Sequence, residues 1–571
     1  MSTVVFSGTA TLTLLVLVLY PLVAILIQSI LPDLFAVPAR LSVSLDPFGR
    51  VFSNPEVLGA LINTAWLGAA VACFGTLLGA GMAVLIKRTD LPGRRLFNAL
   101  VWVTLFTPTY LIALAWELLF SRGGFIDSAI APLPDGVINT IFSPVGLIML
   151  LVLRLAPFAY LATSAALHRL GAEYDEAARL VGAPLLQRWL RINGPLLAPA
   201  LLAGALIIFA EAISDYGTAA TIAQQAGFNL VTYELYAAIN SVPVDFALSA
   251  ALSCLLVAII AIALLLQTRV LRARSYQVIT GRSRSARQVQ LGLWRIPAMA
   301  AIGLYFAAAL VLPLLATGGM SCMRNLSGGF VSANLGWDNY RIALNTGGEA
   351  LLALWRSTLL ALGAATLVAF LGLAIAFTIE RTRLPGRRLL RLLTTVTLAL
   401  PGVVLAVGYI FAWNEVWMQN LFGNTPYGTL GLLFVAYCAG SLPFGVRLAT
   451  GALAQVGTNL LDAGRLAGGG TARLFRGIIV PLLAPTLLST WLLVFTHTLF
   501  ELPTSQLLQP PGQPPLPALI VRQFTVYSQG PATAMTMLAL AVVTVGVLAI
   551  VCLARLARTR WAGASAVTLT L

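Results

Sequence analysis

The segment EAARLVG at residues 176–182 is polar and charged, but it lies between two long apolar stretches. Since an apolar stretch of about 20 residues can span a bilayer as a helix, we expect this segment to form a loop outside the membrane. A related segment, DAGRLAG, occupies residues 462–468, which is 286 residues further along the chain. In both copies an isoleucine and then a proline follow the last glycine at the same distances. A loop that recurs at one spacing predicts a docking site for a cytoplasmic partner protein.

The composition is that of an integral membrane protein. Hydrophobic residues make up 59% of the 571 residues, charged residues only 10%, and the mean hydropathy is +0.91. A water-soluble chain of this length would carry far more charge. We therefore predict an all-α fold with about twelve transmembrane helices. The predicted spans are residues 10–31, 59–86, 97–119, 144–167, 197–218 and 245–268 in the first half, and 296–317, 351–379, 392–413, 427–449, 482–503 and 532–554 in the second.

The first predicted span, residues 10–31, lacks a basic leader and a small-residue cleavage site. We expect it to be a retained helix and not a signal peptide.

The basic residues predict the orientation, because they accumulate on the cytoplasmic side of a membrane. Most of the 35 lysines and arginines lie in segments 87–95, 168–191, 269–295, 381–391, 447–476 and 555–560. This distribution predicts that both termini and both docking loops are cytoplasmic. It also accounts for the net charge of +15 as a feature of membrane topology, and we expect no nucleic-acid partner.

The two halves of the chain repeat. The segment RTDLPGRR at residues 88–95 returns as RTRLPGRR at residues 381–388. Each half holds an even number of predicted spans, so the repeats share one orientation and form a parallel duplication. We predict a first six-span domain at residues 1–268 with its docking loop at 168–196, and a second at 296–571 with its docking loop at 450–481. A basic cytoplasmic linker, 269–295, joins them.

Several kinds of chemistry are excluded. A Walker A loop needs glycine followed by lysine to bind nucleotide phosphates, but Lys87 is the only lysine and follows Ile86. The five cysteines and two histidines are scattered, without the spacing of a metal or disulfide site. We expect no enzymatic activity, no stable metal site and no cofactor in this chain.

Ionisable residues recur in the span after each docking loop. Glu211 and Asp215 in the first half correspond to His497 and Glu501 in the second, and each pair is four residues apart. Residues at this spacing lie on one face of a helix, and charges at membrane depth usually face an interior pathway. They are expected to line the route of a cationic or metal-bearing substrate. Alternatively, they pair with one another or cap helix ends.

One basic residue also falls inside a predicted span. Arg154 lies in the middle of the fourth span, where the second half has Gly440. It either pairs with an acid such as Glu211 or extends its charge to the membrane surface.

The order Glu-Ala-Ala, Gly, Ile, Pro in the first loop resembles the signature of inner-membrane permeases of binding-protein-dependent ABC importers. In that family the loop forms a coupling helix that binds a groove of the ATPase subunit. The resemblance implies coupling residues Glu176, Ala177, Ala178, Gly182, Ile192 and Pro195 in the first loop, and Asp462, Ala463, Gly464, Gly468, Ile478 and Pro481 in the second. The second loop departs at the acid and at the second alanine, so we expect unequal contacts with the ATPase.

This resemblance also implies the type I importer fold, a bacterial inner (plasma) membrane location and partners outside the chain. The implied partners are two copies of an ABC ATPase, which would bind the ATP and magnesium, and a periplasmic substrate-binding protein. Segments 214–218 and 501–510 are similar to fused permeases of ferric-iron importers, so iron(III) is the expected substrate. Related permeases for thiamine, polyamine or aminoethylphosphonate are alternatives.

A secondary transporter of the major-facilitator type is a rival interpretation, since such transporters also have two six-span halves. It leaves the docking loops unexplained.

Overall fold

The structure is a computed structural model. It describes residues 8, 12–35, 41–129, 132–170, 182, 184–272, 288–326, 328, 331–345, 347–382, 387–398, 400–415, 418, 423–454 and 456–561.

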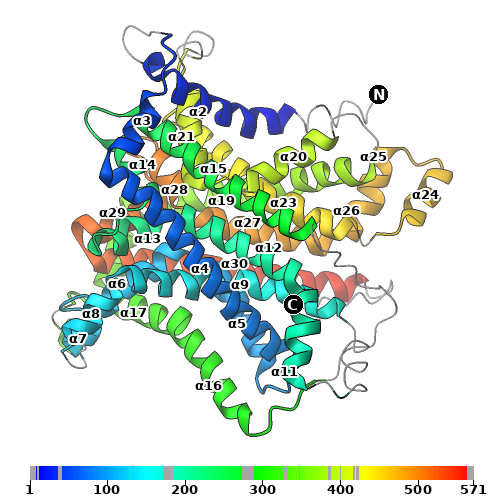
Figure 1. The fold of residues 1–571 in the computed structure, drawn as a ribbon, viewed down its shortest axis with the longest axis horizontal. Coiled ribbons are helices and arrows are strands. Elements are labelled where there is room, and N and C mark those ends of the chain that lie inside the picture. Colours follow the sequence, from blue (N-terminus) through cyan, green and yellow to red (C-terminus); the bar gives the residue numbers. More distant parts are fainter. Residues whose placement is uncertain are drawn as a thin grey trace. The chain divides into compact units, whose positions relative to one another are not determined.

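Long apolar helices make up most of the described chain (Figure 1). Nine of them are long and apolar enough to cross a membrane, and two bent pairs raise that number to eleven. The nine are Leu12–Ile30, α4 (Pro55–Arg88), α9 (Pro144–Arg169), Arg191–Ser214 with α12 (Gly194–Ser214), α15 (Phe246–Arg272), Gly292–Ser321, α19 (Glu349–Arg381), α23 (Leu430–Leu453) and α30 (Gln529–Trp561). They match nine of the predicted spans.

The other three predicted spans are broken helices. The first is α5 (Arg94–Phe106) with α6 (Thr109–Phe120), bent by 96°, and the second is Phe475–Leu482 with α27 (Ala484–Leu499), bent by 67°. The third, predicted at 392–413, is formed by α20 (Arg387–Leu398) and α21 (Gly402–Trp413). Proline explains two of these breaks, because Pro108 and Pro401 precede α6 and α21 and proline cannot donate a helical hydrogen bond. The third span of each half is therefore a helix pair interrupted at a proline.

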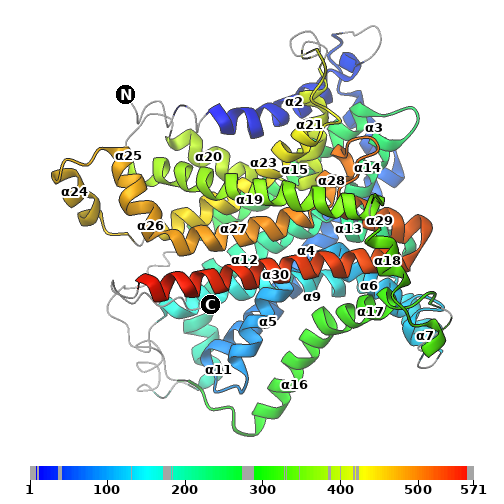
Figure 2. The same cartoon turned by 180° about the vertical axis from the view of Figure 1, so that it is seen from behind.

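The chain packs as two compact units. We call residues Phe48–Leu248 with Cys254–Ala316 the first-repeat unit, and residues Met1–Pro47, Ser249–Ser253 and Thr317–Leu571 the second-repeat unit. In the first-repeat unit α4, α9 and α12 pack against one another, and in the second-repeat unit α19, α23 and α27 do the same. Figure 2 shows α19, α27 and α30 side by side. Both repeats therefore build the same three-helix centre.

The units do not follow the sequence boundary predicted between the repeats. The first span packs in the second-repeat unit, where the Tyr20 hydroxyl donates to the Ala412 carbonyl at 2.6 Å. Conversely, α16 (Arg295–Phe306) packs in the first-repeat unit. The repeats have exchanged their first helices, a result that hydropathy cannot reveal because it measures the length of a span and not its neighbours.

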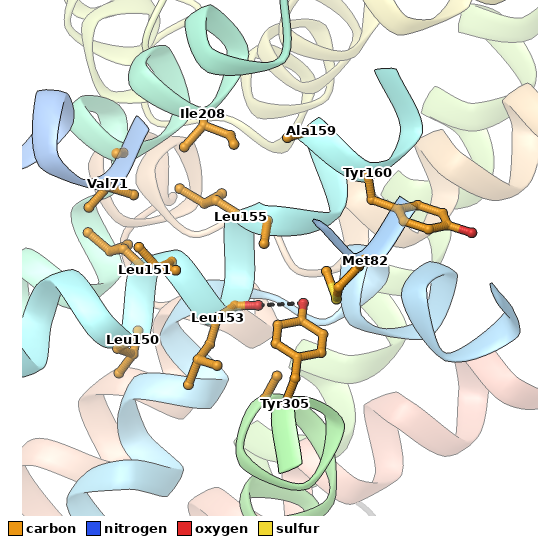
Figure 3. Packing of buried hydrophobic residues seen from close by; sticks show 14 of the residues in the cluster. Val71, Met82, Leu150, Leu151, Leu153, Leu155, Ala159, Tyr160, Ile208 and Tyr305 are labelled. Atoms are coloured by element: carbon orange, nitrogen blue, oxygen red, sulfur yellow. Dashed lines mark hydrogen bonds between the residues drawn. The ribbon is translucent and has the colours of Figure 1, made fainter. Parts of the chain in front are cut away.

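The core of the first-repeat unit shows how the exchanged helix is held (Figure 3). Pro157 lies inside α9 and has no N–H to donate to the carbonyl of Leu153. The hydroxyl of Tyr305, on α16, donates to that carbonyl instead, at 2.9 Å. An unbonded carbonyl would be costly in this apolar core, so the tyrosine replaces the hydrogen bond that Pro157 cannot make within α9.

The helix α15 continues to Arg272 and so includes the first residues of the predicted linker. The far end of the linker is fixed to the loop after α4. Val289 forms a parallel bridge with Thr89, and the Leu291 N–H donates to Asp90 at 2.9 Å. Arg295 also donates to Asp90, at 2.5 Å.

Candidate functional site

The second docking loop contains an amphipathic helix, α24 (Thr458–Leu466), which Figures 1 and 2 show beyond α25 (Thr471–Leu474). The helix ends at Leu466, and Gly468 in the turn that follows has a φ of +80°. The Gly469 N–H donates to the Gly464 carbonyl at 3.0 Å, which satisfies an otherwise unpaired helix-end carbonyl. A side chain at residue 468 would be strained in this conformation, so the turn requires the glycine that recurs in both loops.

The inner face of α24 packs closely on the next turn of the chain. A β-carbon at Gly464 would lie 2.4 Å from Cδ2 of Leu474 and 3.1 Å from Cδ1 of Ile478. This contact gives a physical reason for the departure from alanine at residue 464. The repeated isoleucine has a packing role here, since Ile478 contacts the inner face of α24 at Gly464.

The outer face of α24 is exposed. Asp462 and Ala463 are exposed, and the side chains of Leu460 and Leu466 are 46% and 90% exposed. Such apolar residues on a short helix between spans suit binding in a groove of a partner protein.

The first docking loop is described only in part, because Glu176, Ala177 and Ala178 lie outside the described residues. Gly182 has a φ of +72°, so it takes the same left-handed conformation as its counterpart in the second loop.

The residues that follow the two loops also match in structure. Ile192 lies in η3 (Trp189–Asn193), a π-helical turn, and Ile478 lies in the corresponding turn η8 (Phe475–Ile479). In each copy the repeated proline, Pro195 or Pro481, comes two residues after the π-helical turn. A π-helical turn adds one residue to the helical turn, and both repeats contain it at the same place.

Asp215 lies at a helix break. The helix α12 ends at Ser214, and the Asp215 carboxylate accepts hydrogen bonds from the N–H and the hydroxyl of Thr218, at 2.7 and 2.6 Å. Asp215 therefore caps the short helix α13 (Tyr216–Thr218).

The corresponding residue Glu501 does the same in the second-repeat unit. It follows α27 and accepts hydrogen bonds from the N–H groups of Thr504 and Ser505, at 2.9 and 3.2 Å, at the start of α28 (Pro503–Leu508). Because the helices end before the second acid, neither pair lies on one continuous helix face. Asp215 and Glu501 have the geometry that the alternative interpretation gave them, that of helix caps.

The two capping acids are fitted to different neighbours. Asp215 also hydrogen-bonds the hydroxyl of Thr109 at the start of α6. In the other unit, Oε1 of Glu501 lies 3.1 Å from the position that a β-carbon on Gly402, the first residue of α21, would take. Each acid thus lies beside the proline break of another helix.

Glu211 and His497 differ from the capping acids because their side chains are exposed. Both lie on otherwise apolar helices, next to buried residues such as Ala212 and Thr498. The His497 ring lies 5.1 Å from the ring of Phe444. Exposed ionisable groups at corresponding positions on membrane helices are suited to contact a passing solute.

Arg154 is held inside the first-repeat unit near acidic groups. Its Nε and Nη1 are buried without a hydrogen-bond partner among the described residues, and its charge interacts with those of Glu211 and Asp215. The neighbourhood favours the charge-pair alternative over extension to the membrane surface.

Sequence reasoning missed two features of the described chain. One is Glu117 on α6, whose carboxylate accepts a hydrogen bond from Gln225 at 2.7 Å. The signal was available, as an acid inside the apolar helix TYLIALAWELLF. The other is the role of the repeated arginines Arg88 and Arg381, which hydrogen-bond the helices leading into the docking loops.

Comparison with known proteins places both repeats in one family. The family model described as binding-protein-dependent transport system inner membrane component matches residues 75–276 and 368–561. A protein assigned as a ferric transport system permease in Haemophilus influenzae is 26% identical over 475 residues, covering 79% of this chain and 70% of that relative. The ferric transport system permease protein of Actinobacillus pleuropneumoniae is 25% identical over 84% of this chain and 68% of its own length.

A sulfate transport system permease protein of Escherichia coli is 26% identical over 44% of this chain and 86% of its own length. The match of both repeats to one family of importer subunits excludes the major-facilitator interpretation. The chain belongs to the family of binding-protein-dependent transport system inner membrane components: it is the multi-pass permease of an ABC importer, whose ATPase is a separate subunit.

Proposed function

We propose that this permease imports iron(III). The observation that carries the proposal is the extent of the likeness, since the relatives named for ferric transport align with 79% and 84% of the chain and so with both fused repeats. The sulfate permease aligns with 44%, about one repeat. Charge favours the same cargo, because Glu211 places an exposed carboxylate on a membrane helix, and a carboxylate attracts a cation and repels sulfate.

Two copies of the ATPase bind the cytoplasmic loops at 168–196 and 450–481. The exposed apolar face of α24 supports this assignment, since Leu460 and Leu466 are solvent-exposed on a helix between spans. ATP binding draws the ATPases together and moves the two loops with them, which changes the side from which the route is open. This is a two-state change in which ATP binds one state more tightly.

On the opposite side of the membrane, the periplasmic binding protein delivers its ligand to segments 219–244 and 504–531. Glu211 and His497 contact the cargo within the route, and Asp215 and Glu501 maintain the helix breaks next to them. Both termini remain in the cytoplasm.

The test is uptake of radioactive iron(III) by the complete complex in proteoliposomes, with the binding protein and ATP supplied. A neutralised triple variant, Glu211→Gln, Asp215→Asn and Glu501→Gln, should lose uptake by about tenfold or more, because it removes charge from the route. The amide oxygens still accept the capping hydrogen bonds, so the fold is kept. Glu117→Gln is the matched control, since it neutralises an acid outside the proposed route and should retain most of the uptake.

Two results would contradict the proposal. If the binding protein encoded alongside holds sulfate, thiamine, a polyamine or aminoethylphosphonate in place of iron, the substrate assignment is wrong. If the triple variant transports iron at the wild-type rate, these acids are structural residues only.

A further inference from the structure

The arginine that ends α4 hydrogen-bonds the end of α9, the helix that leads into the first docking loop. Nη2 of Arg88 donates to the carbonyl oxygens of Leu167 and Leu170, at 2.8 and 2.7 Å. Leu170 is the residue that caps α9, so the contact lies at the start of the loop.

The second-repeat unit contains the same contact. Arg381, the last residue of α19, donates from Nη2 to the carbonyl oxygens of Leu453 and Val456. These residues occupy the same places in the second repeat as those of the first contact do in the first repeat: Arg381 corresponds to Arg88, Leu453 to Leu167 and Val456 to Leu170. Val456 lies just before α24, so this contact too is at the start of a docking loop. The first residue of the duplicated segment RT-x-LPGRR thus donates hydrogen bonds to two corresponding backbone carbonyls in both units.

The chemistry of the contact suits a firm attachment. The last carbonyls of a helix have no partner within the helix, and the C-terminal end of a helix attracts positive charge. One guanidinium group satisfies two such carbonyls from a fixed, planar arrangement, which a lysine cannot reproduce. The bonds are partly buried, where water competes with them less.

Each arginine also belongs to a helix pair that is packed closely elsewhere. A β-carbon on Gly79 of α4 would lie 2.2 Å from the Ala156 carbonyl oxygen of α9, and one on Gly372 of α19 would lie 2.7 Å from the backbone of Gly445 of α23. The arginine at the end of the pair therefore adds a second point of attachment, next to the loop. With both contacts in place, the start of each docking loop is attached to two helices.

We propose that Arg88 and Arg381 are positioning residues for coupling, which make each docking loop and its helix pair, α4 with α9 or α19 with α23, move as one body when the ATPases close. The inference rests on the docking loops of the proposed function. Without the arginine, the loop pivots at its start, and ATP is hydrolysed without moving the first helix of the pair.

The experiment measures iron(III) transported per ATP hydrolysed, with the complete complex in proteoliposomes. Arg88→Met and Arg381→Met retain the length of the side chain but remove its donors and charge. We expect each to lower the ratio by about tenfold, as for the loss of a charged hydrogen bond. Arg88→Lys restores charge and part of the bonding, so its ratio should lie between wild type and Arg88→Met. Arg94→Met is the matched control, because Arg94 belongs to the same segment and is exposed.

A helix cap without a part in coupling would give a different result. If assembled complexes of Arg88→Met keep the wild-type ratio while their thermal stability falls, the proposal is wrong. If Arg88→Met does not assemble, Arg88→Lys decides the question. A wild-type ratio of iron(III) transported to ATP hydrolysed in Arg88→Lys, equal to that of Arg94→Met, would overturn the proposal. Failure of the docking assignment itself is distinguishable, since the ATPase then remains bound after both docking loops are altered.

Discussion

The close crossing of α4 and α9 predicts that Gly79→Ala destabilises the first-repeat unit. The added β-carbon would lie 2.2 Å from the Ala156 carbonyl oxygen, 2.8 Å from the Tyr160 nitrogen and 2.9 Å from the Ala159 β-carbon. Two of these are backbone atoms, which cannot move aside by a change of rotamer. The helices must separate by about 1 Å, since unstrained contacts of this kind are about 3.5 Å long.

The magnitude follows from two opposing terms. Overpacking of a closely packed site costs about 1–3 kcal/mol, whereas alanine in place of glycine favours the helix by about 1 kcal/mol. The matched control is Gly81→Ala, two residues further along α4, where nothing lies within 4 Å of the new β-carbon. Gly81→Ala therefore gains the helix preference of alanine without the cost of overpacking. We therefore expect Gly79→Ala to be less stable than Gly81→Ala by about 2 kcal/mol.

The assay is unfolding of the purified protein in detergent, followed by the loss of helix signal with rising denaturant. Gly372→Ala should repeat the effect in the second-repeat unit, because its β-carbon would meet the backbone of Gly445 at 2.7 Å. Equal stabilities for Gly79→Ala and Gly81→Ala would refute the reasoning, since the close approach would then not constrain the helices.

Three further predictions concern the docking loops and the linker end. Glu176→Ala with Gly182→Leu should uncouple ATP hydrolysis from iron uptake while membrane insertion continues, and wild-type coupling in that variant would count against the docking loop. Damage to the first loop should reduce uptake more than Gly464→Leu in the second loop, whereas equal losses would contradict the unequal contacts expected of the two loops. The Leu291 N–H and the Arg295 guanidinium lower the pKa of Asp90. The ionised carboxylate therefore stabilises the linker end at pH values above its ordinary pKa, and this stabilisation is lost as the pH falls below about 4. Hydrogen exchange of the Leu291 amide should therefore lose protection in acid, and at pH 7 in Asp90→Ala, which removes the acceptor oxygen; constant protection would show that the carboxylate does not hold it.

The part of the fold that depends on local sequence was predictable. Span positions follow from the length of the apolar stretches, and the recurring glycines Gly182 and Gly468 do have the left-handed conformation that turns require. The breaks at Pro108 and Pro401 had a local signal as well, because proline was present in each predicted third span.

The roles of the intramembrane charges were less predictable, because they depend on where a helix stops. Glu211 and Asp215 are four residues apart, which would place them on one helix face only if α12 continued past Ser214. The competing interaction was the hydrogen bond from the Thr218 N–H to Asp215, which ends one helix and begins another. The exchange of first helices between units was beyond reach for a different reason, since it depends on contacts such as that of the Tyr305 hydroxyl with the Leu153 carbonyl, 152 residues apart.

A comparison of the repeats separates two kinds of residue. Two copies of one ATPase, as proposed, would require like attachments. The features found in both units are structural ones near the docking loops, such as the arginines Arg88 and Arg381 and the left-handed glycines. A single small cargo imposes no such symmetry. Arg154 has charge in the first-repeat unit, whereas its counterpart by sequence, Gly440, is uncharged. We therefore expect variants at Arg154 to change which cargo passes, and variants at the duplicated residues to change how much ATP each passage requires. The two classes can be told apart by measuring cargo preference and ATP per transport event in the same preparation.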